Sequence, residues 1–316
     1  MDSRLQYAIL NTLSYFQVFE YPLTKEEILK YLPVKCNIVT LEASLGVLAS
    51  INVIYRIDNY YCLKNDLKLV YRRKQGNKIG RQKLKKANLV ARFLGLFPFV
   101  EAVCISGSLS KDFALKDSDL DYFIITAPNR MWMARNFMHL FRKLTFAVNA
   151  QKMFCMNYFI SIQELMINPQ NEFTAIELAS LKPAFVHTGW NELITINSPW
   201  VSHYLPNAGK EKSTYPKTKK AFLTRVVEYM INKIGGDKIE DWFYKSTMKR
   251  WAKKWALQGY DVEKCMLSAG QHFNTPVNYP KNLPEIILYK QDQIFEEAKI
   301  KLLSASYGFL STICYN

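Results

Sequence analysis

Apolar side chains recur at helical spacing through the first fifty residues. Residues 4 to 19 carry dense apolar positions with this spacing and predict a first helix. Thr24 and Glu27 form a capping box, which predicts a second helix that stops at Pro33. Thr40 is expected to cap a third helix over the next apolar repeat. The N-terminal part is therefore predicted to be a cluster of short helices.

The pattern changes from helical to strand-like after the third helix. Residues 53–57 and 60–63 are short runs of apolar and aromatic side chains, and the turn residues Asp58 and Asn59 separate them. These runs predict a hairpin. Three helices followed by a hairpin resemble a winged helix-turn-helix domain.

The third helix lacks the side chains that recognition of a DNA sequence needs. Recognition helices present Arg, Lys, Asn or Gln to base edges. This helix offers Glu42, Ser44 and Ser50, and the hairpin adds only Arg56. We therefore expect no sequence-specific DNA binding, and a structural or protein-contact role for this domain.

Residues 72–92 form the most basic stretch of the chain. Nine of them are Lys or Arg and none is acidic. Gly76 and Gly80 weaken the first half as a helix, whereas a helical apolar stripe begins after Arg81. We expect a basic connector between domains, which either presents a solvated face or holds a polyanion.

The central stretch, residues 103 to 125, combines two apolar runs with a polar loop in VCISGSLSKDFALKDSDLDYFII. Both outer runs predict strands, since they are short and rich in β-branched or aromatic side chains. Residues two apart in a strand point to the same face. Asp119 and Asp121 should therefore project side by side, with Leu120 and Tyr122 on the opposite face.

Two adjacent carboxylates repel each other unless a cation lies between them, and Mg²⁺ prefers carboxylate oxygen. Gly107 ends the preceding strand and allows close backbone approach, so its N–H group and the Ser108 hydroxyl can hold phosphate oxygens. The alternative is a surface loop before an ordinary strand with two solvated aspartates. The apolar flanks disfavour it, because an unpaired buried carboxylate is costly.

This arrangement resembles the nucleotidyltransferase superfamily of the polymerase-beta type, over about residues 98 to 165. Its motif is an apolar residue, Gly, then Gly or Ser, a gap of about ten residues, and Asp-apolar-acid-apolar. The whole chain looks like bacterial nucleotidyltransferase-domain proteins. The resemblance implies that NMP passes from an NTP such as ATP to the hydroxyl of an unidentified acceptor, anionic acceptors included, with release of pyrophosphate.

The resemblance also implies roles for particular residues. Asp119 and Asp121 would bind Mg²⁺ or Mn²⁺, and Gly107 and Ser108 would contact the β and γ phosphates. The nucleotide-binding loop would also include Ser110 and Lys111, the latter as a counter-charge to phosphate.

One position departs from the superfamily pattern. A third carboxylate usually comes from a later strand, here predicted at residues 152–162, where the best-placed polar residue is Asn157. An amide can ligate Mg²⁺ through its oxygen but cannot act as a base. Glu164 and Glu177 lack the expected position within a strand. The alternative function is therefore a non-catalytic nucleotide-binding or regulatory module on a degenerate nucleotidyltransferase fold.

The remaining chain is predicted to be mostly helical. Helices are expected at 130–147, within 217–258 and at 284–304, and the stretch 191–216 is expected to interrupt regular structure at its prolines. The helix after Asp237 interleaves aromatic and basic side chains. Such spacing can stack bases or lie on a membrane, although the aromatic residues more often face a core. His272, Asn274 and Asn278 are expected in a loop.

Composition limits the kinds of partner and the cellular compartment to be expected. The net charge of +15 favours an anionic partner such as nucleotide, nucleic acid, anionic glycan or a membrane surface. The six cysteines form no CxxC pair, so neither a zinc site nor a disulfide framework is expected. Free thiols fit the reducing cytoplasm. The N-terminus has no signal-like layout, and the apolar runs are too short for a membrane span.

Together these observations predict an α+β protein of 316 residues with a small mixed sheet flanked by helices. The expected parts are a winged-helix-like domain, a basic linker helix, a nucleotidyltransferase core and a helical C-terminal domain, at 1–70, 71–97, 98–200 and 201–316.

Overall fold

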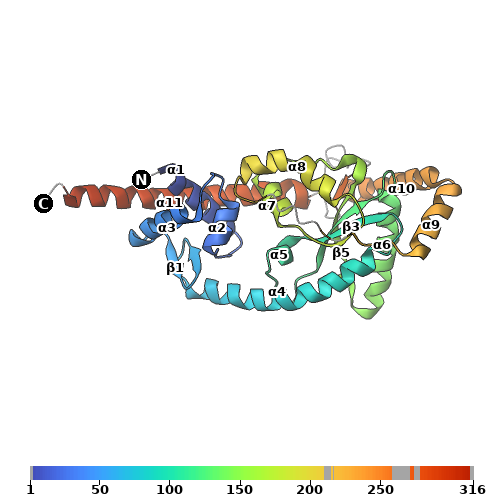
Figure 1. Cartoon of the computed structure of the whole chain (residues 1–316), viewed down its shortest axis with the longest axis horizontal. Coiled ribbons are helices and arrows are strands. Elements are labelled where there is room, and N and C mark those ends of the chain that lie inside the picture. Colours follow the sequence, from blue (N-terminus) through green and yellow to red (C-terminus); the bar gives the residue numbers. More distant parts are fainter. Residues whose placement is uncertain (1–2, 210–214, 216, 258–270, 274–277, 314–316) are drawn as a thin grey trace.

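The computed structural model describes residues 3–209, 215, 217–257, 271–273 and 278–313. The protein is elongated, with the N-terminal helices at one end and the main sheet toward the other (Figure 1). Two long helices, α4 and α11, run along opposite sides and join these two parts. The described chain is a mixed α+β structure with a small mixed sheet, as the sequence predicts.

The N-terminal helices and hairpin occur where the apolar pattern predicts them. Thr24 caps the second helix, and its capping box with Glu27 is complete. The third helix begins earlier than expected: Asn37, and not Thr40, is the cap, because its side chain accepts a hydrogen bond from the Thr40 N–H. The elements are α1 (Ser3–Gln17), α2 (Lys25–Tyr31), α3 (Ile38–Ser50), β1 (Tyr55–Ile57) and β2 (Tyr60–Cys62).

The basic stretch is one continuous helix, α4 (Leu67–Leu94), which spans the domain limit expected at residue 70. Its first half is helical in spite of Gly76 and Gly80, whereas the sequence placed the helical stripe only after Arg81. A Cβ at Gly76 would meet the Phe113 ring, and one at Gly80 would lie 2.5 Å from the Asp112 carbonyl oxygen. The Ala114 N–H donates to the Gly76 carbonyl at 3.1 Å. The glycines therefore let the loop before Asp119 pack directly on the helix.

The main sheet has the strand order β6-β3-β4-β5-β7. Strand β4 is parallel to β5, whereas the other neighbouring pairs are antiparallel. The strands are β3 (Val100–Ile105), β4 (Asp121–Thr126), β5 (Cys155–Ser161), β6 (Lys182–Val186) and β7 (Gln271–Phe273). The mixed sheet is confirmed, and β6 and β7 extend it beyond the predicted strands.

Different helices cover the two faces of this sheet. Val103 and Tyr122 pack with α4 and α6 on one face, and Cys104 and Phe123 pack with α7 and α8 on the other. This alternation follows the two-residue period of a strand. The helices are α5 (Gly107–Ser110), α6 (Met131–Thr145), α7 (Glu172–Ser180), α8 (Trp190–Tyr204), α9 (Phe222–Lys233) and α10 (Gly236–Leu257), with short 3₁₀ turns at Phe146–Val148, Gln151–Met153 and Ile162–Glu164.

Helix α8 corrects the prediction that regular structure breaks down from residue 191. Pro199 lies inside this helix, and the domain limit expected at residue 200 falls within it as well. Proline removes one N–H donor from a helix. The Thr195 carbonyl is the group that loses its helical donor to the proline. The Ser198 hydroxyl donates to this carbonyl at 3.2 Å and so satisfies it. The helix can therefore continue through the proline.

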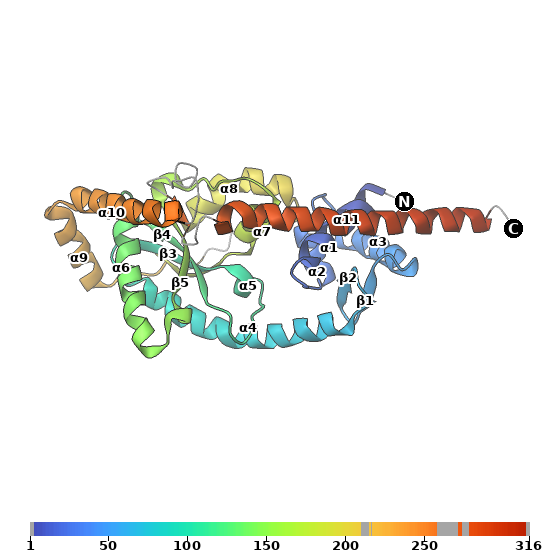
Figure 2. The same ribbon diagram turned by 180° about the vertical axis from the view of Figure 1, so that it is seen from behind.

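The C-terminal helix α11 (Asn278–Ile313) returns along the molecule to the N-terminal helices (Figure 2). Its Ile287, Ala298 and Leu302 belong to the same apolar core as the residues of α1. Helix α10 packs instead on α6. The segment expected as a separate helical domain therefore divides its contacts between the sheet and the N-terminal helices.

The C-terminal strand and helix also change two local expectations. His272 lies in β7 rather than in a loop, and Asn278 begins α11, whereas Asn274 lies outside the described residues. Among the described helices, none is long and apolar enough to cross a membrane.

Candidate active site

The loop after β3 lies directly against the first residue of β4. Gly107 has a φ of +64°, which favours glycine, and the neighbouring Ser106 N–H donates to the Asp121 carbonyl at 3.0 Å. A Cβ at Gly107 would lie 2.6 Å from Asp121 Oδ2. The packing therefore explains the glycine of the sequence motif: only glycine lets the loop approach this carboxylate so closely.

Asp121 is a mostly buried carboxyl group at the start of β4. Burial raises its pKa to about 6, and the negative charges of Asp119 and Glu177 add to the rise. The neighbouring Cys155 thiol and the hydrogen bond from the Asn157 amide oppose it. A bound cation would remove most of this unfavourable charge burial, so the environment of Asp121 favours a positive ligand.

Asp119 lies before the strand that the sequence predicted to contain it. β4 begins at Asp121, although Leu120 already makes backbone hydrogen bonds with Lys152 and Cys155 at 2.9 and 3.2 Å. Leu120 and Tyr122 are buried on the opposite face, as expected. The two aspartates are near enough for the charge of Asp119 to raise the pKa of Asp121. The predicted pair is thus brought together at one end of β4.

Asn157 reaches the site through an irregularity in β5. The pairing runs from Tyr122–Met156 to Phe123–Tyr158 and leaves Asn157 as an extra residue. Such bulges redirect side chains, and they are frequent beside active sites. Asn157 Nδ2 donates to Asp121 Oδ1 at 2.6 Å.

The orientation of the Asn157 amide decides what this side chain can do. Its Oδ1 accepts a hydrogen bond from the Cys155 thiol at 3.1 Å, while its NH₂ group faces Asp121. An NH₂ group cannot bind a metal. In this orientation the Asn157 amide oxygen faces Cys155, and the NH₂ group holds the Asp121 carboxylate in place.

The remaining residues of the loop after β3 differ in whether their side chains can contact a ligand. Ser108 is exposed, so its hydroxyl is free to meet a ligand. Ser110 is buried and donates to the Gly107 carbonyl at 2.7 Å, which makes it a structural residue of the loop. Lys111 Nζ lies 2.6 Å from Glu177 Oε1. Its charge is already paired, which weakens its predicted role as the counter-charge to phosphate.

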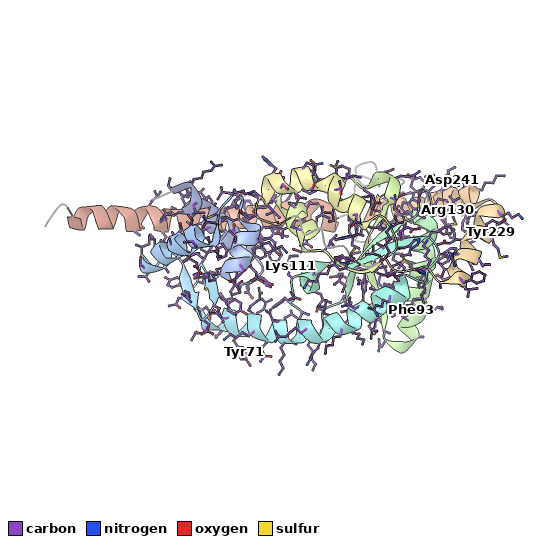
Figure 3. All side chains as sticks on the ribbon, in the orientation of Figure 1. Tyr71, Phe93, Lys111, Arg130, Tyr229 and Asp241 are labelled. Carbon is purple, nitrogen blue, oxygen red and sulfur yellow. The ribbon has the colours of Figure 1, made fainter. Side chains whose placement is uncertain are left out.

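Figure 3 places Lys111 in the middle of the molecule, between the N-terminal helices and the sheet. The Tyr21 hydroxyl donates to the Lys111 carbonyl at 2.6 Å, and the Tyr21 ring lies 5.5 Å from the Phe113 ring, centroid to centroid. The segment between α1 and α2 therefore contacts the loop that follows Gly107 directly.

Two further charged residues, Glu177 and Lys83, lie in this region. Glu177 comes from α7 and is 66 positions from its partner Lys111. Lys83 of α4 donates to the Ser118 carbonyl at 2.6 Å, and burial lowers its pKa. The basic composition of α4 suggested a role beside an anion, whereas no local pattern pointed to Glu177.

The donor groups fit one divalent ion that shares its ligands with a substrate. Among the described residues, His, Cys, Asp and Glu form no group of three that could hold a metal. Mg²⁺ commonly binds through one or two carboxylates plus substrate phosphates. Asp119 and Asp121 are the two carboxylates that could form such a set, with Gly107 packed directly beside Asp121.

Comparisons with known proteins add no assignment. The chain matches no family model, no curated protein and no solved structure. The functional argument therefore depends on the residues and geometry described above.

Metal binding is expected to weaken as the pH falls through about 6. The folded-state pKa of Asp121 is raised from 3.8 to about 6, so below that pH a proton competes with the ion for the carboxylate. We expect the affinity for Mg²⁺ or Mn²⁺ to fall by up to about tenfold per pH unit below 6 and to be flat above 7. Calorimetric titration from pH 5 to 8 measures this dependence.

The raised pKa of Asp121 also determines how the stability of the metal-free protein changes with pH. Because folding raises this pKa, the protonated carboxyl stabilises the metal-free protein fully below the unfolded-state pKa, near 4, and that contribution is lost as the pH rises through about 6. Mg²⁺ should therefore raise the melting temperature more at pH 8 than at pH 5. Equal shifts at both values would contradict a role for Asp121 in metal binding.

Proposed function

We propose that the protein is a Mg²⁺-dependent nucleotidyltransferase that moves NMP from an NTP to an acceptor hydroxyl and releases pyrophosphate. The observation that carries this proposal is the packing of Gly107 against the mostly buried Asp121 carboxylate, with Asp119 close by. This geometry supports a loop whose backbone could contact phosphate beside a pair of carboxylates that could bind a cation.

The residues of the chain act mainly by positioning. Asp119 and Asp121 would hold the divalent ion, and the Gly107–Ser108 backbone with the Ser108 hydroxyl would contact the terminal phosphates. When bound, the ion neutralises phosphate charge and lowers the pKa of the attacking hydroxyl. Asn157 fixes one Asp121 oxygen through its 2.6 Å hydrogen bond. Alignment of the hydroxyl with the α-phosphate is the main contribution that such a site can make.

No carboxylate base stands at the position of Asn157. General-base help is typically worth about 10²–10⁴-fold in rate, so the enzyme is expected to turn over slowly unless the ion alone activates the acceptor. Glu177 is the acid that the structure adds to the neighbourhood, but it is paired with Lys111 at 2.6 Å. Phosphates that bind Lys111 would have to compete with Glu177.

Asn157→Asp tests this assignment of roles. A carboxylate at position 157 would face Asp121 where the amide now donates. We expect the metal-free variant to lose about 1–3 kcal/mol of stability, because a donor is replaced by a like charge. Mg²⁺ should bind more tightly than in the wild type, and slow NTP hydrolysis or transfer at neutral pH should increase.

The measurements are thermal melts with and without Mg²⁺ and pyrophosphate release with a panel of NTPs. Asn149→Asp is a matched control, since this asparagine is exposed in a loop and the change adds the same charge. Robust wild-type turnover that Asn157→Asp reduces would contradict the assignment of position 157 as the place of a missing carboxylate.

A non-catalytic nucleotide-binding module is the second candidate. The amide of Asn157 donates to Asp121 where a third carboxylate is usual in the superfamily, and the described residues supply no group of three acidic or metal-ligating side chains. Such a module would bind NTP with Mg²⁺ without releasing pyrophosphate.

We also propose a winged-helix-like, structural role for the N-terminal domain, without recognition of a DNA sequence. Glu42 of α3 forms an ion pair with Lys25 of α2, so the surface that a recognition helix would present carries a mutually paired acid and base. The Tyr21–Lys111 hydrogen bond shows that this domain already has a partner surface within the chain.

One experiment separates the two candidates. NTPs labelled at the γ-phosphate are incubated with the protein in Mg²⁺ or in EDTA, and both bound nucleotide and released labelled pyrophosphate are measured. The transferase predicts Mg²⁺-dependent binding and pyrophosphate release. Binding without release favours the non-catalytic module, and the absence of Mg²⁺-dependent binding contradicts both.

A further inference from the structure

A basic pocket of about 570 Å³ lies between α6 and α10, in addition to the carboxylate site. Its cationic lining residues include Arg135 and Lys143 from α6 and Arg250 from α10. Trp242 and Trp251 from α10 supply aromatic surface beside them. The pocket therefore combines positive charge with exposed rings.

The charges in this pocket repel one another. Burial and the nearby Arg250 charge lower the pKa of Arg135 to about 9. Burial lowers the pKa of His139 well below its usual value, and Arg135, Arg142, Lys143 and Arg250 all act in the same direction. The described lining residues include no acid. An anion in the pocket would relieve this repulsion.

Aromatic rings surround the buried guanidinium. The Arg135 guanidinium lies 5.4 Å from the centre of the Trp251 ring and 5.7 Å from that of Trp132. Trp242 is 63% exposed, so its ring is open to a planar ligand. His139 Nε2 is buried and has no hydrogen-bond partner among the described residues. The pocket can therefore hold both a phosphate and a flat ring.

Helix α6 connects this pocket to the carboxylate site. Helix α6 packs on β5, the strand that carries Asn157, and the ring of the pocket residue His139 lies 6.1 Å from the Phe159 ring, centroid to centroid. Cys155 hydrogen-bonds to Asn157, which in turn hydrogen-bonds to Asp121. The pocket therefore lies on a helix that packs against the strand whose Asn157 contacts Asp121.

We propose that the α6–α10 pocket binds single-stranded nucleic acid, with phosphate held by Arg250 and a base stacked on Trp242. This inference rests on the proposed transferase function, because the bound strand would be the acceptor whose end reaches Asp121. A single strand presents unstacked bases to aromatic side chains, whereas a duplex hides them. A concave pocket with a buried guanidinium is better suited to a single phosphate group than to a flat lipid surface.

The test uses fluorescence anisotropy with short, labelled single-stranded RNA and DNA in EDTA, so that nucleotide transfer cannot occur. Arg250→Gln and Trp242→Ala are each expected to weaken binding by about tenfold, because each removes a phosphate contact or a stacking platform. Both residues are exposed, so the variants should fold. Lys249→Gln, an exposed neighbour of Arg250 outside the pocket, should change the affinity by less than about twofold.

Three results would overturn the proposal. Equal losses in the Arg250 and Lys249 variants would show attraction to net charge alone. If inorganic phosphate displaces the strand as effectively as free nucleotide does, and strand binding does not depend on Trp242, the pocket is a simple anion site. Binding to phosphatidylserine vesicles that depends on Arg250 and Trp242, without strand binding, would show a membrane surface instead.

The Asp121→Asn variant separates this proposal from the transferase function. Strand binding in EDTA should be unchanged in that variant. Retained strand binding in a protein that releases no pyrophosphate would contradict the transferase and leave the pocket supported. Turnover with an acceptor other than nucleic acid, together with no strand binding, would contradict the pocket and support the transferase.

Discussion

Asp121→Asn is expected to lower Mg²⁺-dependent nucleotide transfer by about 10³-fold or more, since loss of an ion's charge stabilisation is worth several kcal/mol. The substituted amide cannot neutralise a divalent ion, although it has nearly the same shape as the carboxylate. The backbone contact between Ser106 and position 121 uses the main chain and should persist. The loss should therefore appear in metal-dependent binding and turnover and not in folding.

The metal-free stability of this variant gives a second readout. Burial raises the pKa of Asp121 to about 6, so its ionised form destabilises the folded protein at neutral pH. Removing that charge should leave the melting temperature at pH 8 unchanged or slightly higher. Asp117→Asn, which changes an exposed residue of the preceding loop, is the control and should retain activity. Wild-type affinity for Mg²⁺–NTP in the Asp121 variant would contradict the assigned role.

Lys220→Met is expected to cause the largest loss of stability. Lys220 Nζ lies 2.7 Å from Glu101 Oε1 of β3 and 2.7 Å from Glu228 Oε1 of α9. Glu228 Oε1 also accepts the Phe99 N–H at 2.6 Å. The lysine therefore neutralises two carboxylates at a buried junction between the sheet and α9.

Without the ammonium group, two carboxylates remain buried together. Removing one partner of a buried ion pair typically costs about 3–5 kcal/mol. Burial already raises the pKa of Glu101, and the variant should raise it further, so part of the loss should be recovered as the pH falls and the carboxyl groups protonate. Urea unfolding at pH 8 and pH 5 measures both effects.

The control for this experiment is Lys219→Met, which changes the exposed neighbour of Lys220 in the same way. We expect it to alter the free energy of unfolding by less than about 0.5 kcal/mol. A similar value for Lys220→Met would show that the two glutamates are adequately solvated without the lysine.

Local patterns predicted the elements that bear the candidate site. The apolar runs around Gly107 and Asp121 become β3 and β4, and the strand with Asn157 pairs with β4. The two-residue period of a strand correctly separated the buried Leu120 from the carboxylates. These features depend on residues close together in the chain, which is why the sequence reveals them.

Features that depend on distant segments could not be predicted in the same way. The bulge that turns the Asn157 NH₂ group toward Asp121 arises from register between two strands. The pairing of Lys111 with Glu177 depends on where α7 packs. By local propensity alone, Gly76 weakens a helix. A tertiary contact explains why glycine stands there, because a Cβ at this position would meet the Phe113 ring.

The most direct test is a crystal structure with Mn²⁺ and a non-hydrolysable NTP, in which anomalous diffraction locates the metal. The central claim predicts an Mn²⁺ peak at about 2.0–2.6 Å from carboxylate oxygens of both Asp119 and Asp121, with the terminal phosphates at Gly107 and Ser108. Metal or nucleotide bound elsewhere, with these two carboxylates free of both, would contradict it.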